Sequence, residues 1–245
     1  MTHPSDKKPK VRTPKIPNFE AHAQPWVVGS DHMGQVPATS LDADFLRSTF
    51  SQTWQTQLDL PPETRIRFQG HEDHWVEAAV LVPFVLRETG ITVMLTQRTA
   101  HLHDHAGQVS FPGGRIETFD ANPHAAAIRE TVEETGLPAH HIDVVGQLPL
   151  YRTGTGFHIT PVAALIKPGF DLAPDAFEVA QVFEVPLAFF TDPQNYRLHT
   201  AHLSDGSTRQ YYSVPWQDYF IWGATAAMLR GTYQILAAAF DSIKR

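Results

Sequence analysis

Three closely spaced glutamates constrain most strongly what this chain can fold into. Glu130, Glu133 and Glu134 stand at positions i, i+3 and i+4, so on a helix their carboxylates share one face. Like charges placed in this way repel one another and destabilise the helix. A cation bound among them would relieve the repulsion, and the alternative is an exposed acidic helix face. Oxygen ligands in this number are typical of Mg²⁺ or Mn²⁺.

The segment around the glutamates carries the signals of a helix start and a helix end. Asn122 is a favourable N-cap, and Pro123 suits the first helical position. Gly136 supplies the left-handed residue that ends many helices, and Pro138 prevents continuation. The sequence therefore predicts a helix over residues 123–135.

A glycine pair stands before this helix. Gly113 and Gly114 carry no Cβ, so their backbone can approach other groups closely, and the Gly114 carbonyl is a candidate ligand for the same ion. Arg129 lies four residues before Glu133 and is expected to hold that carboxylate in place.

These motifs together resemble a known family. The segment Gly114 to Leu137 is similar to the signature box of the Nudix hydrolases, which cleave a nucleoside diphosphate linked to another group. The box reads glycine, five residues, glutamate, seven residues, and then Arg-Glu-hydrophobic-x-Glu-Glu-x-Gly-hydrophobic. Three departures occur here: Asp120 replaces the first glutamate, one extra residue separates it from Arg129, and Thr131 replaces an aliphatic residue.

The stretch before the box narrows the resemblance to one branch. Leu95 to Arg98, Leu102 and His105 to Gly114 resemble the coenzyme A pyrophosphatases, whose box shares the aspartate and the extra residue. Further similarity covers Tyr151 to Pro161 and Ile221 to Ala226. The resemblance implies an α/β chain with a mixed sheet in an α/β/α sandwich.

The resemblance also implies an activity, a cofactor and a set of site residues. The implied reaction splits the diphosphate of coenzyme A or its thioesters into 3′,5′-ADP and 4′-phosphopantetheine or its acyl form. Mg²⁺ or Mn²⁺ would neutralise the diphosphate and lower the pKa of bound water. The expected metal ligands are Glu130, Glu133, Glu134 and Gly114; the expected catalytic residues are Glu133, Glu134, Glu178 and Arg129; and the expected substrate-binding residues are Arg98, His105, Gly113 and Arg115.

Several of these side chains also have a structural interpretation that involves no catalysis or binding. Glu178 is the expected general base, because Nudix enzymes often supply an acid from this region, but it also reads as a solvated loop carboxylate. Arg98 suits a phosphate or a structural salt bridge. Glu117 and Asp120 suit the outer metal shell or an exposed turn. His105 has histidine neighbours at alternate positions, a spacing without a helical ligand face, so zinc is disfavoured.

Two rival functions stay open. The first is a Nudix enzyme acting on ADP-ribose, a dinucleotide or an oxidised nucleotide, which the stretch before the box disfavours. The second is a non-catalytic nucleotide-binding module. Such modules commonly lose glutamates of the box, whereas all three are present here.

Composition excludes several other classes. A net charge of −7 over 245 residues implies no broad basic face for nucleic acid. The absence of cysteine excludes disulfides and thiolate catalysis and fits a cytoplasmic location. The longest apolar run, Ala78 to Leu86, is too short to span a membrane. The expected partner is a small molecule, coenzyme A or acyl-coenzyme A, and a homodimer is left open.

The chain divides into three predicted parts. Residues 1–25 are rich in proline and polar residues and are expected to form a disordered arm. Residues 26–75 form an N-terminal extension with a helix from Leu41 to about Trp54, capped by Ser40, and residues 76–245 form the Nudix hydrolase domain. The predicted strands are 77–86, 91–98, 108–111, 142–148, 157–166, 179–185, 196–203 and 208–213, and a last helix covers 224–243.

Overall fold

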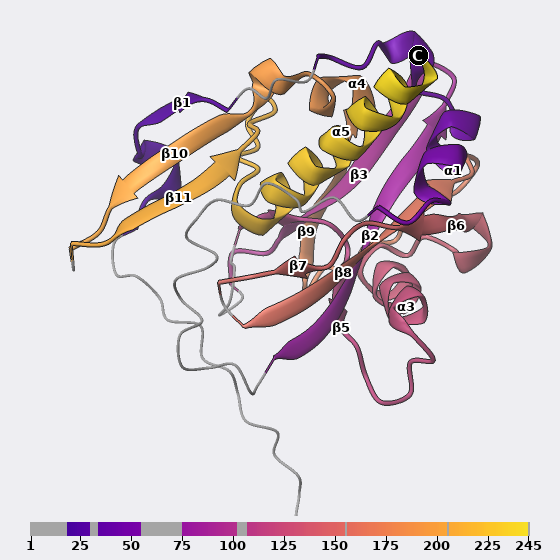
Figure 1. The fold of residues 1–245 in the computed structure, drawn as a ribbon. Helices are drawn as coiled ribbons and strands as arrows, with labels where there is room; N and C mark the ends of the chain where they lie inside the picture. Colours follow the sequence, from indigo (N-terminus) through magenta and orange to yellow (C-terminus); the bar gives the residue numbers. More distant parts are fainter. Residues whose placement is uncertain are drawn as a thin grey trace, which may run out of the picture.

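The fold has three layers. The computed structural model describes residues 19–29, 34–54, 75–101, 107–154, 156–204 and 206–244. An eight-stranded sheet lies between helix α3 (Pro123–Thr135) on one face and helices α1 (Ala43–Phe50) and α5 (Gly223–Ile243) on the other (Figure 1). The expected α/β/α sandwich is confirmed.

The central sheet is mixed. Its main path runs β4-β3-β2-β8-β6, while β5 pairs with β2, β7 with β8, and β9 with β3. The β2–β8 pair is parallel and the other pairs are antiparallel. The strands are β2 (Val76–Arg87), β3 (Gly90–Arg98), β4 (Val109–Ser110), β5 (Gly113–Arg115), β6 (Ile142–Gln147), β7 (Tyr151–Arg152), β8 (Phe157–Ile166) and β9 (Val179–Pro186).

Alternating side chains of the central strands build a core on each face of the sheet. On β2, Leu81 and Val85 belong to the cluster with Ala126 of α3, whereas Val82 and Phe84 belong to the cluster under α1 and α5. The period of two is that of a strand buried on both faces. Each fully buried large aliphatic side chain contributes roughly 1.5–3 kcal/mol. The small alanines of α3 let that helix lie close to the sheet.

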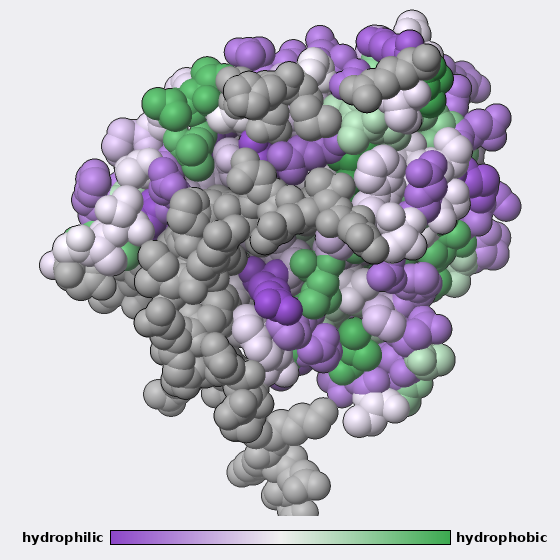
Figure 2. All heavy atoms as spheres, viewed as in Figure 1, coloured by the Kyte–Doolittle hydropathy of each residue, from purple (hydrophilic) through white to green (hydrophobic). Residues whose placement is uncertain are grey.

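A second, three-stranded antiparallel sheet extends from the α5 side (Figure 1). It contains β1 (Trp26–Val28), β10 (Arg197–His202) and β11 (Thr208–Ser213), and a short helix α4 (Leu187–Phe190) comes before β10 in the chain. The 3-10 turns are η1 (Ala21–Ala23), η2 (Ala38–Ser40), η3 (Ala139–His141) and η4 (Pro193–Asn195). Hydrophobic and hydrophilic residues are interspersed on the visible face, with a hydrophobic group over β1 (Figure 2).

The residues just before β1 differ from the expected arm. Residues 19–25 contain η1, the Phe19 ring meets the Tyr211 ring edge-on at 5.8 Å, and the Tyr211 hydroxyl donates to the Ala21 carbonyl. These contacts bury Ala21 against β11. Residues 1–18 lie outside the described residues, and the division into three parts stays a prediction.

Two local predictions need correction. The predicted helix from Leu41 to Trp54 is shorter, and its cap is Asp42 rather than Ser40, because the Asp42 carboxylate accepts from the Phe45 N–H at 2.8 Å while Ser40 closes η2. The glycine pair, which lies outside the predicted strands, belongs to a short strand, since Gly113–Arg115 pairs with β2. Among the described residues, none of the helices is long and apolar enough to cross a membrane.

Candidate active site

Helix α3 begins and ends where the sequence predicts. The Asn122 side chain accepts from the Ala125 N–H at 2.9 Å. Gly136 has a φ of 71°, and its N–H donates to the Val132 carbonyl at 2.9 Å. Both ends of the helix are therefore held by local hydrogen bonds, and these bounds set the register of the three glutamates.

Arg129 connects most of the polar groups on this side of the helix. Its Nη1 donates to Glu130 at 2.8 Å and to Glu133 at 3.0 Å, which confirms the expected contact with Glu133. Its Nη2 also donates to the Arg115 carbonyl at 3.1 Å. The guanidinium thus lies between two carboxylates that would otherwise repel each other.

Asp120 holds this guanidinium from the opposite side. Its two oxygens accept from Nε and Nη2 of Arg129 at 3.0 and 2.9 Å, and it also accepts from the Glu117 N–H at 2.8 Å. The Arg129 hydrogen bonds lower the pKa of Asp120, and the same bonds are the main cause of the raised pKa of Arg129. Asp120 therefore orients Arg129, and through it Glu130 and Glu133. With 4% of its side chain exposed, Asp120 is not an exposed turn residue.

Glu134 is the buried member of the three glutamates. It is 7% exposed, and its Oε2 accepts from the Gly113 N–H at 3.1 Å. Burial raises the pKa of Glu134 to about 7, against the smaller opposing effects of that hydrogen bond and of Arg98. Arg98 Nη1 lies 3.8 Å from Glu134 and 3.9 Å from Glu178. The structure thus brings the expected base to the same arginine as the buried glutamate.

Gly114 lies against the third glutamate. A Cβ on Gly114 would stand 2.6–2.7 Å from the carboxylate atoms of Glu130, so only glycine leaves room for this approach. Burial also raises the pKa of Glu130. Carboxylates beside a backbone carbonyl are the hard oxygen donors that suit Mg²⁺ or Mn²⁺. Across the described ranges, however, no three acidic or histidine side chains converge to hold an ion, and the cation between Glu130 and Glu133 is Arg129.

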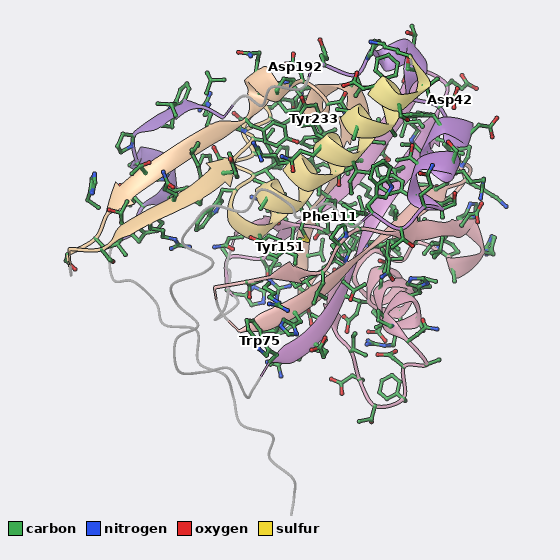
Figure 3. All side chains as sticks on the ribbon, in the orientation of Figure 1. Asp42, Trp75, Phe111, Tyr151, Asp192 and Tyr233 are labelled. Atoms are coloured by element: carbon green, nitrogen blue, oxygen red, sulfur yellow. The ribbon has the colours of Figure 1, made fainter. Side chains whose placement is uncertain are left out.

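A cavity of about 400 Å³ adjoins the glycine pair. Its walls come from the glycine strand β5, the end of β3, the start of α5, and β7, β8 and β11. Phe111 and Tyr151 lie beneath the first turns of α5 (Figure 3) and are 2% and 6% exposed, so both serve the core as well as the wall. Phe157 and Trp222 line the cavity and are only partly buried.

The other predicted residues fall in different places. Arg115 lines the cavity, and its guanidinium carbon lies 5.8 Å from the centroid of the Phe157 ring. His105 lies outside the described residues. Arg209, Tyr212 and Met228 also line the cavity, although sequence reasoning did not select them. They belong to no motif, and only the packing of β11 and α5 brings them to the site.

Comparison with known proteins identifies the family. The NUDIX domain model matches residues 75–208. The uncharacterized Nudix hydrolase NudL of Citrobacter koseri is 40% identical over 158 residues, which cover 63% of this chain and 79% of that protein. The protein of the same name from Cronobacter sakazakii is 44% identical over 159 residues, with the same coverage. The chain belongs to the Nudix hydrolase family.

Among solved structures, the Nudix hydrolase RenU from M. smegmatis is similar, with a TM-score of 0.40 and 24% identity over 47% of this chain and 80% of that one.

Membership of the Nudix hydrolase family defines the class of activity. The protein is a pyrophosphohydrolase acting on nucleoside diphosphate derivatives, in a family that generally requires divalent metal ions.

Proposed function

We propose that the protein is a coenzyme A diphosphatase that depends on Mg²⁺ or Mn²⁺. It would hydrolyse coenzyme A or its thioesters to 3′,5′-ADP and 4′-phosphopantetheine or its acyl form. The observation that carries this proposal is the cavity beside the glycine pair, taken with the Leu95 to Gly114 stretch that resembles this branch.

The cavity suits a diphosphate that carries a long, weakly polar arm. Its volume of about 400 Å³ lies within the range of small-molecule sites. Gly113 and Gly114 lie at its wall beside the glutamate helix, and Ile159, Trp222 and Met228 add apolar surface to the lining. A pantetheine chain along the apolar wall would leave the diphosphate beside the glycines.

The proposed chemistry is attack of water on one phosphorus. A new P–O bond forms, the bridging P–O bond breaks, and the other phosphate leaves. The bound ion would supply charge neutralisation and a lower pKa for its water. Glu130, Glu133, Glu134 and the Gly114 carbonyl would hold the ion, while Arg129 keeps two of the glutamates in place.

Two groups outside the helix complete the proposed site. Arg98 would donate to the diphosphate, because it ends β3 at the cavity wall. Glu178 would accept the proton of the attacking water, and its position 3.9 Å from Arg98 supports this role. Electrostatic positioning of this kind carries most of the barrier reduction in phosphoryl transfer.

Product analysis by mass spectrometry tests the proposal. A panel of coenzyme A, acetyl-coenzyme A, ADP-ribose, a dinucleotide and an oxidised nucleotide is offered at equal concentration with Mg²⁺. We expect the highest kcat/KM for coenzyme A or its thioester, with 3′,5′-ADP as a product, and no turnover with chelator. A higher kcat/KM for ADP-ribose or the dinucleotide would defeat the proposal.

A further inference from the structure

The charged side chains lining the cavity are all cationic. The described lining residues include Arg98, Arg115 and Arg209 but no aspartate or glutamate. The whole chain, by contrast, carries a net charge of −7. Positive charge concentrated in a cavity with low-dielectric walls attracts anions more strongly than the same charge on an open surface. Glu134 and Glu178 lie 3.8 and 3.9 Å from Arg98 and offset part of its charge, whereas the lining itself offers only cations to a ligand with several negative charges.

Two of the three arginines adjoin the place expected for a diphosphate. Arg98 ends β3 and lies 3.8 Å from Glu134, and Arg115 ends β5 directly after Gly114. Arg209 differs because it belongs to β11, in the second sheet. It is also the first residue after the segment matched by the family model.

Aromatic rings hold the Arg209 guanidinium in place. Its central carbon lies 4.8 Å from the centroid of Phe19, 5.7 Å from that of Tyr211 and 5.8 Å from that of Trp222. Distances of this size are those of cation–π contacts, which hold a guanidinium at a defined place in the wall of the cavity. An arginine held there is suited to recognise a phosphate, with which the guanidinium group can form two parallel hydrogen bonds.

We infer that Arg209 binds a phosphate monoester of the substrate that is separate from the diphosphate. The site then selects nucleotides that carry an additional terminal phosphate. This inference rests on the proposed function, because coenzyme A carries such a group on its ribose. Arg98 and Arg115 serve the diphosphate, and Arg209 serves the monoester.

The first test compares coenzyme A with dephospho-coenzyme A, which lacks the monoester. For the wild-type protein we expect kcat/KM about tenfold or more higher for coenzyme A, since charge-assisted hydrogen bonds are worth this much. The Arg209→Gln variant should bring the ratio close to one, mainly through KM, and Arg209→Lys should give an intermediate ratio.

Arg197→Gln is the matched control. Arg197 lies on the neighbouring strand β10, and its guanidinium carbon is 4.4 Å from the centroid of the Trp26 ring, yet it is not among the residues lining the cavity. This variant loses the same charge and the same type of ring contact, and should keep the wild-type ratio. A wild-type ratio near one, or a ratio that Arg209→Gln and Arg197→Gln leave equally unchanged, would overturn the inference.

A binding measurement separates this inference from the proposed reaction. Calorimetric titration with 3′,5′-ADP and with 5′-AMP, in chelator, needs no turnover. We expect the wild type to bind 3′,5′-ADP about tenfold more tightly, and Arg209→Gln to bind the two equally. If coenzyme A is not cleaved but this preference depends on Arg209, the proposed function fails and the inference stands. If coenzyme A is cleaved and the wild type has no preference, the inference fails alone.

Discussion

At the scale of single residues, a series of contacts between oppositely charged side chains holds the residues of the site in position. Asp120 holds Arg129 with two hydrogen bonds, and Arg129 holds Glu130 and Glu133 in turn. Each contact joins opposite charges, so the repulsion between neighbouring glutamates is offset within the protein itself. Groups that hold ligand side chains in this way typically contribute about 10–100-fold to metal affinity or activity.

The glutamate cluster is tested by removing one charge while keeping the side-chain shape. We predict that Glu133→Gln, whose side chain is 59% exposed, folds normally and loses turnover by orders of magnitude, because a metal ligand charge is lost. Glu134→Gln should behave likewise, whereas Glu88→Gln in the distant β2–β3 turn should not. Steady-state kinetics with excess Mg²⁺ provide the measurement. Near-normal rates for both cluster variants would make the metal assignment wrong.

The buried Glu134 carboxyl predicts how stability depends on pH when metal is absent. Its pKa rises from an ordinary 4.5 to about 7 on folding, so the folded protein binds this proton more tightly than the unfolded chain does. The free energy of unfolding therefore falls as pH rises through that window, by an amount on the order of 2–3 kcal/mol. Burial shifts the pKa of Glu130 in the same direction.

Thermal melts in chelator between about pH 5 and pH 8 check this expectation. The wild-type Tm should decrease with pH, and Glu134→Gln should flatten that dependence and melt higher than wild type at the alkaline end. Glu133→Gln, on the exposed side of the same helix, serves as control and should keep the wild-type slope. An unchanged slope in Glu134→Gln would refute the assignment of the pH dependence to this carboxyl.

At the scale of elements, helix α3 and strand β5 pack against each other, and particular residues of both make this close packing possible. The buried Thr131, where the family box has an aliphatic residue, donates its hydroxyl to the Ala127 carbonyl at 2.7 Å. Its polar group is thus satisfied inside the helix, which makes the departure compatible with burial. Gly113 and Gly114 then set how closely β5 approaches β2 and α3.

The two glycines should respond differently to alanine. At Gly113 the φ is 151° and a Cβ would stand 2.4 Å from the Ala79 carbonyl, so Gly113→Ala should destabilise by about 1–3 kcal/mol or more. At Gly114 a Cβ meets only the movable end of Glu130, so Gly114→Ala should keep most stability and lose activity. Melting curves and kcat measured together decide the matter. Equal loss of Tm in both variants, or full kcat in Gly114→Ala, would contradict it.

At the scale of the whole molecule, residues near the N-terminus pack against side chains that line the cavity. Phe19 contacts both Arg209 and Tyr211, which line the cavity. The second sheet and the segment before β1 therefore adjoin a site whose expected catalytic residues lie in α3 and just before β9. Cytoplasmic location and a homodimer stay predictions.

Two truncations separate the roles of the N-terminal segments. Removing residues 1–18 should leave kcat and KM unchanged apart from weak, salt-screened attraction between its basic residues and phosphates. Removing residues 1–25 deletes the Phe19 and Ala21 contacts and should raise KM with little change in kcat. Kinetics at two salt concentrations provide the measurement. A tenfold loss of kcat in the shorter truncation, with normal folding, would show that the segment completes the catalytic site.

The sequence alone determined the parts of the protein that depend on near neighbours. The caps at Asn122 and Gly136 and the contact of Arg129 with Glu133 involve residues at most four apart, and the structure has all of them. Helix geometry dictates which side chains meet at such separations. For the same reason, the sequence was enough to predict that the three glutamates share one face of the helix, and to recognise the family resemblance that this motif carries.

Only the tertiary structure decided which distant residues meet. Arg98 approaches Glu178 because β3 pairs with β9 in a register that places Arg98 opposite Val179. Asp120 reaches Arg129 across a turn, and Arg209 reaches the cavity through the second sheet. Strand register and the packing of one sheet beside another arise from the summed burial of many side chains, and no short motif in the sequence encodes them.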